Sequence, residues 1–95
     1  VDTSSQGKRS ARIEHAMRAW GARDRQVRTV LQDVDTRREA YVRGLLTDHG
    51  LTSSVASQRA RILYLALIGE FAWISHGGAA SGPEPWRELV RLLLR

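Results

Sequence analysis

The side chains that could carry chemistry are few and widely separated. The chain of 95 residues has no cysteine and three histidines, His15, His49 and His76. Helical metal sites place two ligands within one turn, as in His-x-x-x-His, and no such pair occurs. No serine lies in a Gly-x-Ser-x-Gly turn, and the glycine-rich segment 77–82 lacks the Lys-Ser/Thr ending of a phosphate-binding loop. We therefore expect no metal, no cofactor and no enzymatic activity.

Glu70 stands inside the longest apolar run of the chain, residues 62–74. Burying an unpaired carboxylate is costly, so Glu70 needs a partner. Two interpretations are open. Glu70 forms an ion pair with an arginine, which could belong to a second subunit, or it contacts a cationic or hydroxylated small molecule. From polarity and helical facing, we expect a ligand pocket formed by Met17, Trp20, Tyr41, Tyr64 and Glu70.

Helical spacing of apolar residues runs through the chain, and no alternation indicates a strand. The pattern predicts an all-α fold of four or five helices, with residues 1–7 as a flexible lead-in and 8–95 as the domain. We expect a first helix from Lys8 to Gly21, in which Ile13, Ala16, Met17 and Trp20 line one face. The later helices are expected over 24–50, over 52–76 and from Pro83 onward, with a flexible break at 77–82 and a possible kink at 37–38.

The net charge of +5 does not form a nucleic-acid patch. Acidic residues are interspersed among the basic ones, whereas phosphate binding needs a contiguous excess of positive charge. No residue of this chain is assigned to DNA contact. The absence of cysteine favours a reducing compartment, so we expect a cytoplasmic protein. The run 62–74 is too short to span a bilayer, and we expect no membrane partner.

The apolar run 62–74 also predicts self-association. A helix that is apolar on every side needs partners on two sides, and three other short helices cover only part of it. We expect a two-fold homodimer in which the last two helices of each subunit form a four-helix interface. The alternative is a crowded monomer covered by arginine stems. The expected interface residues are Leu67, Phe71, Ile74, Trp86, Val90 and Leu93.

Four segments resemble the C-terminal half of tetracycline-repressor (TetR) family regulators. They are 12–24 (RIEHAMRAWGARD), 34–46 (VDTRREAYVRGLL), 59–71 (RARILYLALIGEF) and 82–90 (GPEPWRELV). The resemblance covers about residues 8–95, and the arginine-rich composition is similar to that of actinobacterial members.

The resemblance implies a bacterial transcriptional regulator, usually a repressor. In that family the last two long helices pair about a two-fold axis, and an effector bound in this half releases operator DNA held by an N-terminal helix-turn-helix. No helix-turn-helix precedes Arg12 here, so DNA binding is expected through a domain outside this chain. The alternative function is a standalone helical dimerisation or protein-interaction module without DNA binding.

Overall fold

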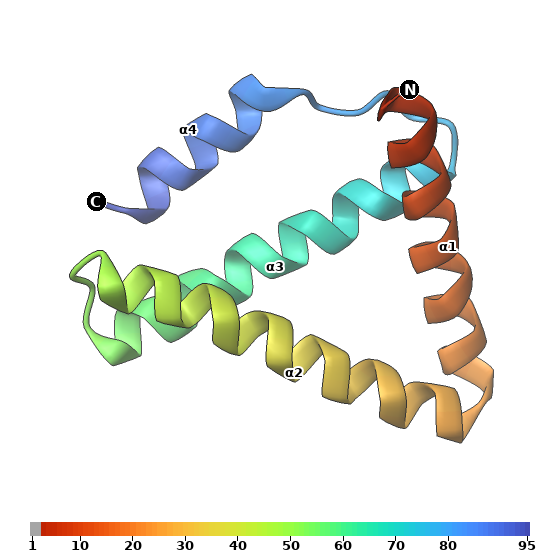
Figure 1. The fold of residues 1–95 in the computed structure, drawn as a ribbon, viewed down its shortest axis with the longest axis horizontal. Helices are drawn as coiled ribbons and strands as arrows, with labels where there is room; N and C mark the ends of the chain where they lie inside the picture. Colours follow the sequence, from red (N-terminus) through yellow and green to blue (C-terminus); the bar gives the residue numbers. More distant parts are fainter. Residues whose placement is uncertain (1–2) are drawn as a thin grey trace.

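The computed structural model describes residues 3–95, with side chains from residue 6 onward. The described residues form helices and connecting segments, so the predicted all-α class is confirmed. The four helices, in chain order, are α1 (Thr3–Arg23), α2 (Arg25–Asp48), α3 (Ser53–Ser75) and α4 (Pro83–Leu93) (Figure 1).

Short polar side chains and a glycine set the bounds of α2 and α3. Asp24 Oδ1 accepts hydrogen bonds from the backbone N–H groups of Gln26 and Val27, at 2.9 and 3.2 Å. The Thr52 hydroxyl caps α3 in the same manner. Gly50 has a φ of +110°, which suits a glycine that ends a helix. The predicted bounds of these two helices are confirmed, and α2 runs without a break through residues 37–38.

Helix α1 is longer than predicted at both ends. It begins at Thr3, so five of the seven residues expected as a lead-in are helical, and it continues past Gly21 to Arg23. Gly21 has a different role from the expected stop. A Cβ built on it would lie 2.7 Å from Leu31 Cδ1, so the missing side chain lets α2 approach α1 closely.

The helices form a flat molecule, with principal extents of 36 × 33 × 21 Å. Helices α1, α2 and α3 trace a triangle, and α4 lies on the other side of α3 from α2 (Figure 1). In so thin a shape most helices have two exposed sides, and the core is small. Its main cluster joins Leu46, Ala56 and Ala60, with Val42, Leu51 and Leu94 packed around them.

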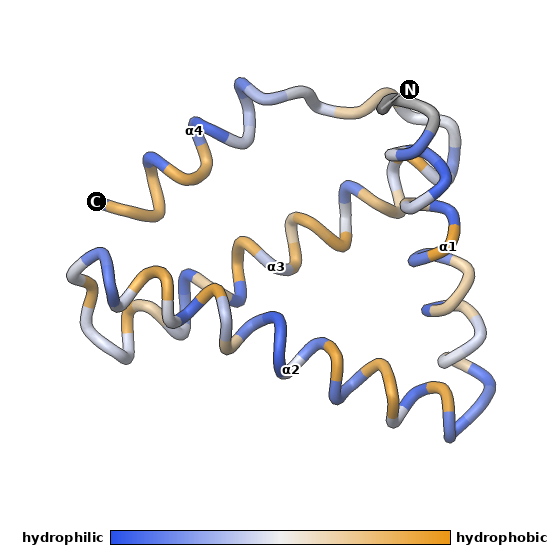
Figure 2. Tube along the Cα trace, viewed as in Figure 1, coloured by the Kyte–Doolittle hydropathy of each residue, from blue (hydrophilic) through white to orange (hydrophobic). Residues whose placement is uncertain are grey.

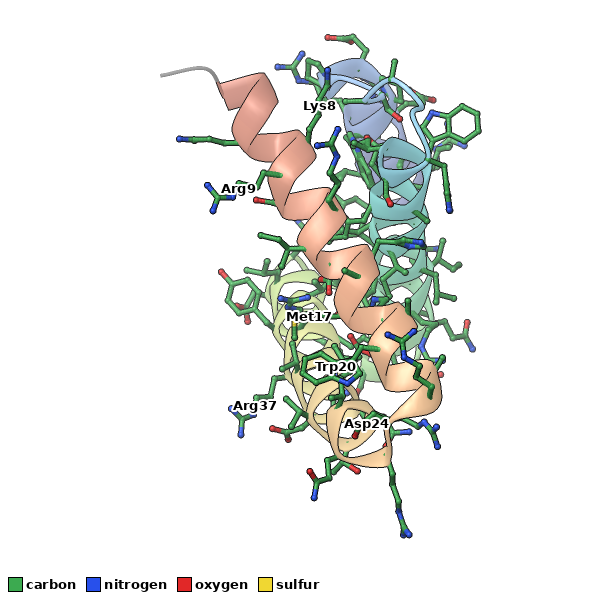
Figure 3. The ribbon with its side chains drawn as sticks, turned by 90° about the vertical axis from the view of Figure 1, so that its right-hand side faces the viewer. Lys8, Arg9, Met17, Trp20, Asp24 and Arg37 are labelled. Carbon is green, nitrogen blue, oxygen red and sulfur yellow. The ribbon has the colours of Figure 1, made fainter. Side chains whose placement is uncertain are left out.

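Helix α1 places polar side chains toward the other helices and large apolar side chains toward solvent, the reverse of a simple amphipathic helix. Its inner side carries Ala11, Glu14, Arg18 and Gly21, whereas Ile13, Met17 and Trp20 are 52%, 37% and 50% exposed. Figure 3 shows Met17 and Trp20 following one another along α1. The apolar spacing therefore predicted the helix correctly but marked its exposed side.

Helix α4 is held at its two ends by side chains of α3. At its C-terminal end, Arg59 Nη1 donates hydrogen bonds of 2.6 and 2.7 Å to the carbonyls of Leu93 and Arg95. At its N-terminal end, Glu70 accepts from Ser81 and Trp86. Cations favour the carbonyl end of a helix, so the Arg59 contact also suits the α4 dipole.

We expect Asp24→Ala to lower the free energy of unfolding by about 1 kcal/mol, because two N–H groups of α2 lose their acceptor. Asp48→Ala is the control. Asp48 is exposed in the last turn of α2, where a negative charge does not favour the helix dipole. Urea unfolding of both variants measures the difference, and an equal loss in the two would contradict the capping role.

Candidate functional site

One side chain from each long helix meets at the centre of the triangle. Arg18 of α1 donates two hydrogen bonds to Asp35 of α2, with Nη2–Oδ1 at 2.7 Å and Nη1–Oδ2 at 3.1 Å. The Tyr64 hydroxyl of α3 donates to the same Asp35 Oδ1 at 2.5 Å. Asp35 therefore joins three helices through one carboxylate, and the paired geometry with Arg18 is the strong, directional kind.

Two further charges complete this central cluster. Arg38 Nη1 donates to Glu14 Oε1 at 2.7 Å and reaches the Tyr64 hydroxyl at 3.5 Å. Glu14 Oε2 also lies 3.8 Å from Arg18 Nε. With two arginines and two carboxylates the cluster is neutral, so its charges can be partly removed from water at modest cost.

The pKa shifts of Asp35 and Tyr64 hold both groups in their ordinary charge states at neutral pH. The hydrogen bonds from Arg18 outweigh partial burial and lower the pKa of Asp35. Burial, reinforced by the bond to Asp35, raises the pKa of the Tyr64 hydroxyl. The carboxylate stays ionised and the phenol stays protonated, an arrangement that holds helices together rather than transferring protons.

An apolar hollow of about 340 Å³ opens beside Tyr64. It is lined by Arg37, Arg38, Tyr41, Val42, Tyr64 and Leu67. The structure thus brings together Tyr41 and Tyr64 of the predicted ligand pocket. Met17 and Trp20 lie instead on the exposed side of α1. Glu70 lies in a different depression, so the five predicted residues do not form one site.

Glu70 lies in a groove between α3 and α4. Its Oε1 accepts a hydrogen bond from the Ser81 hydroxyl at 2.6 Å, and its Oε2 accepts from Ser81 N at 3.0 Å and from Trp86 Nε1 at 3.3 Å. Partial desolvation raises the pKa of Glu70, but these bonds outweigh it, so the pKa lies below its ordinary value. The carboxylate is therefore anionic at neutral pH.

The groove has a volume of about 340 Å³. Its lining residues are Ala66, Gly69, Glu70, Trp73, Ser81, Pro85, Trp86 and Leu89. Trp73 is 63% exposed, and its indole lies against Gly78, where a Cβ would collide with the ring. Two of the three tryptophans of the chain therefore line the groove that contains Glu70.

Glu70 differs from the other glutamates in its partners. Glu14, Glu39, Glu84 and Glu88 each form an ion pair with an arginine. Within residues 6–95, no arginine or lysine of the chain lies within 4.0 Å of the Glu70 carboxylate. The ion pair that the sequence allowed for Glu70 is therefore absent within the described chain, and neutral donors take its place.

The residues predicted for a dimer interface fall into two groups. Leu67, Phe71 and Ile74 are half-buried on the side of α3 that carries Tyr64, and Leu93 is buried within the chain. Trp86 is half-buried and Val90 is 40% exposed on α4. The large exposed residues of α3 are instead Ile62, Leu65 and Trp73, which follow one another on its opposite side.

Sequence reasoning missed most of the central cluster. The spacing of Glu14 and Arg18 signals an i,i+4 pair, but no local pattern links either residue to Asp35 or Tyr64. His15 and His76 also meet, with ring centroids 4.8 Å apart, although 61 positions separate them in the chain. Within the described part of the chain no group of three or more potential ligands could hold a metal ion.

No helix in the described residues is long and apolar enough to cross a membrane. No protein-family model, curated protein or solved structure matches the chain.

We expect Asp35→Asn to lower the free energy of unfolding by about 1–3 kcal/mol, because it weakens a charged link among three helices. The Asp35 side chain is 25% exposed, so solvent screening keeps the effect below that of a fully buried pair. Asp33→Asn is the control, since its ion pair with Arg37 is well exposed. That variant should change stability by less than about 0.5 kcal/mol.

The same aspartate predicts a pH dependence. Because the folded state lowers the pKa of Asp35, its contribution is complete above the ordinary pKa of about 3.9 and is lost as pH falls through the folded value. Stability of the unmodified chain should therefore decline below about pH 4 more steeply than that of Asp35→Asn. Parallel curves in urea titrations at several pH values would count against the role of Asp35.

Proposed function

We propose that this chain is a homodimeric, ligand-sensing regulatory domain of a TetR-like transcriptional regulator. The observation that carries the proposal is the exposed side of α3, where Ile62, Leu65 and Trp73 are 51%, 56% and 63% exposed. Apolar patches of this kind on a helical protein favour an interface. In this proposal, operator DNA is bound by a helix-turn-helix outside the chain, and the chain supplies pairing and effector response.

Two features favour a second copy of the chain as the partner of this side of α3. Ile62, Leu65 and Trp73 are uncharged, while the chain carries a net charge of +5, and the neighbouring Arg61 is paired with Glu39. Two like-charged molecules meet most easily through their uncharged surfaces. Gly69 lies between Leu65 and Trp73, so the same side offers both a projecting side chain and a gap. A two-fold axis requires such self-complementarity.

An effector response is compatible with the arrangement of α4. This helix is joined to α3 through residues 76–82, in which Gly77 and Gly82 have positive φ values of +95° and +78°. Ligand binding in the groove between α3 and α4 would favour one position of α4 over others. Such a shift transmits a signal only if the ligand prefers one conformation.

A second candidate function is a protein-interaction module without an effector. The exposed apolar side of α1, formed by Ile13, Met17 and Trp20, favours it. This side belongs to a different helix from the proposed dimer interface. The two candidates differ in which apolar surface is covered in solution.

The proposal predicts that the chain is a dimer in solution and that Leu65→Glu converts it to a monomer. At a two-fold interface the two introduced carboxylates would be buried and would repel each other. This should weaken association at least 100-fold. Light scattering coupled to size-exclusion chromatography measures the mass directly. Circular dichroism checks that the variant remains helical.

Leu45→Glu provides the matched control, because Leu45 is a leucine of similar exposure, 51%, on α2. This variant should remain a dimer. A monomeric unmodified chain would refute the proposed dimer. Loss of the dimer in Leu45→Glu but not in Leu65→Glu would move the interface to α2 and refute the proposed side of α3.

A further inference from the structure

The groove between α3 and α4 combines a negative charge with two large aromatic rings. The anionic Glu70, Trp73 and Trp86 all line it. Cations bind favourably to the faces of tryptophan rings, and quaternary ammonium groups are bound in aromatic cages. We propose that this groove binds a small organic cation of the ammonium type, with Glu70 as the counter-ion and Trp73 and Trp86 as its aromatic walls.

The hydrogen bonding of Glu70 supports a cationic occupant. A carboxylate has about four acceptor positions, and Ser81 and Trp86 fill three of them with neutral donors. These donors fix the orientation of the carboxylate but leave its charge without a counter-ion in residues 6–95. An incoming cation would therefore find an oriented negative charge without first displacing an arginine.

The arginine-rich composition of the chain makes the lack of an arginine partner at Glu70 notable. The chain has 15 basic and 10 acidic residues, and among the residues described six carboxylates form ion pairs with arginine. The four other glutamates are paired with arginines. The net positive charge repels free cations in general, so binding depends on the local field and the aromatic walls of the groove.

The size and lining of the groove set the class of cation. Its volume of about 340 Å³ is near the lower end of the range of about 300–1,000 Å³ for ligand pockets. Ala66, Pro85 and Leu89 add apolar surface, which favours methylated ammonium groups over a strongly hydrated primary amine or a metal ion. A trimethylammonium group satisfies both the charge and the apolar lining.

The position of Trp73 depends on a glycine. Its indole occupies the space that a Cβ of Gly78 would fill, so the ring is seated against the backbone that follows α3. Gly78 does not have a positive φ, so an alanine there is opposed by the ring alone. Gly78→Ala therefore displaces one aromatic wall while the carboxylate is retained.

This inference rests on the proposed function, because it names the ligand class of a ligand-sensing domain, but its test is separate. The groove is formed within a single chain, but Trp73 also lies on the proposed dimer interface. Cation binding is therefore measured in the Leu65→Glu variant, which should be monomeric, as well as in the unmodified chain. Binding without dimerisation would retain the site and refute the proposed dimer. Dimerisation of the unmodified chain, together with no binding by the Leu65→Glu variant, would support the dimer and refute the cation site.

The test titrates choline into the isotope-labelled chain and follows the indole N–H signals of its three tryptophans by NMR. Choline should shift the Trp73 and Trp86 signals saturably and leave the Trp20 signal, on α1, unchanged. Its neutral carbon analogue, dimethylbutanol, has the same shape without the charge. We expect choline to bind at least ten-fold more tightly than this analogue.

Three variants assign the effect to the groove. Glu70→Gln should reduce choline affinity to that of the neutral analogue, whereas Trp73→Leu and Gly78→Ala should each lower it several-fold. Trp20→Leu is the control and should bind choline normally. If Glu70→Gln fails to fold, as judged by circular dichroism, the two wall variants still decide the matter, because Trp73 is mainly exposed.

Three results would overturn the proposal. Choline could produce no shift, it could bind no more tightly than dimethylbutanol, or it could shift Trp20 as strongly as the groove tryptophans. The second result would indicate an apolar groove without cation selectivity. The third would indicate general surface binding.

Discussion

The Asp35 carboxylate is the contact on which the arrangement of the three long helices depends. It accepts hydrogen bonds from Arg18 and Tyr64 and thereby joins α1, α2 and α3 at one point. The apolar core is small by comparison, since only seven of the described apolar residues are buried, three of them alanines, and no large side chain among them is fully buried. A thin molecule buries little apolar area, so directional polar contacts determine how its helices cross.

That polar centre explains why so much apolar surface faces outward. Helix α1 turns Glu14 and Arg18 inward to reach their partners, and Ile13 and Met17 are then carried to the outside by the helical repeat. Figure 2 shows apolar positions distributed along every helix, and several of the large ones are exposed. The exposed side of α3 has the same origin, because Tyr64 must face Asp35.

Local sequence signals predicted the helices well, but they could not predict contacts between residues far apart in the chain. Asp24, Gly50 and Thr52 act on their own neighbours, so their types and positions marked the helix bounds. The bond between Tyr64 and Asp35 spans 29 positions, and no periodicity encodes it. Glu70 was recognised from its apolar surroundings, but its donors lie on a connecting segment and on α4, whose placement depends on the whole fold.

The attachment of α4 by its two ends has a consequence for how the native state opens. Arg59 holds the last carbonyls of α4, Glu70 holds the segment where it begins, and the glycines at 77 and 82 allow the intervening chain to bend. Release of these two contacts, together with Leu93 and Leu94 from the core, would free α4 as a unit while the Asp35 centre stays closed. The amides of α4 should therefore exchange with solvent through a low-energy partial opening, and those around Leu31 and Tyr64 only on global unfolding.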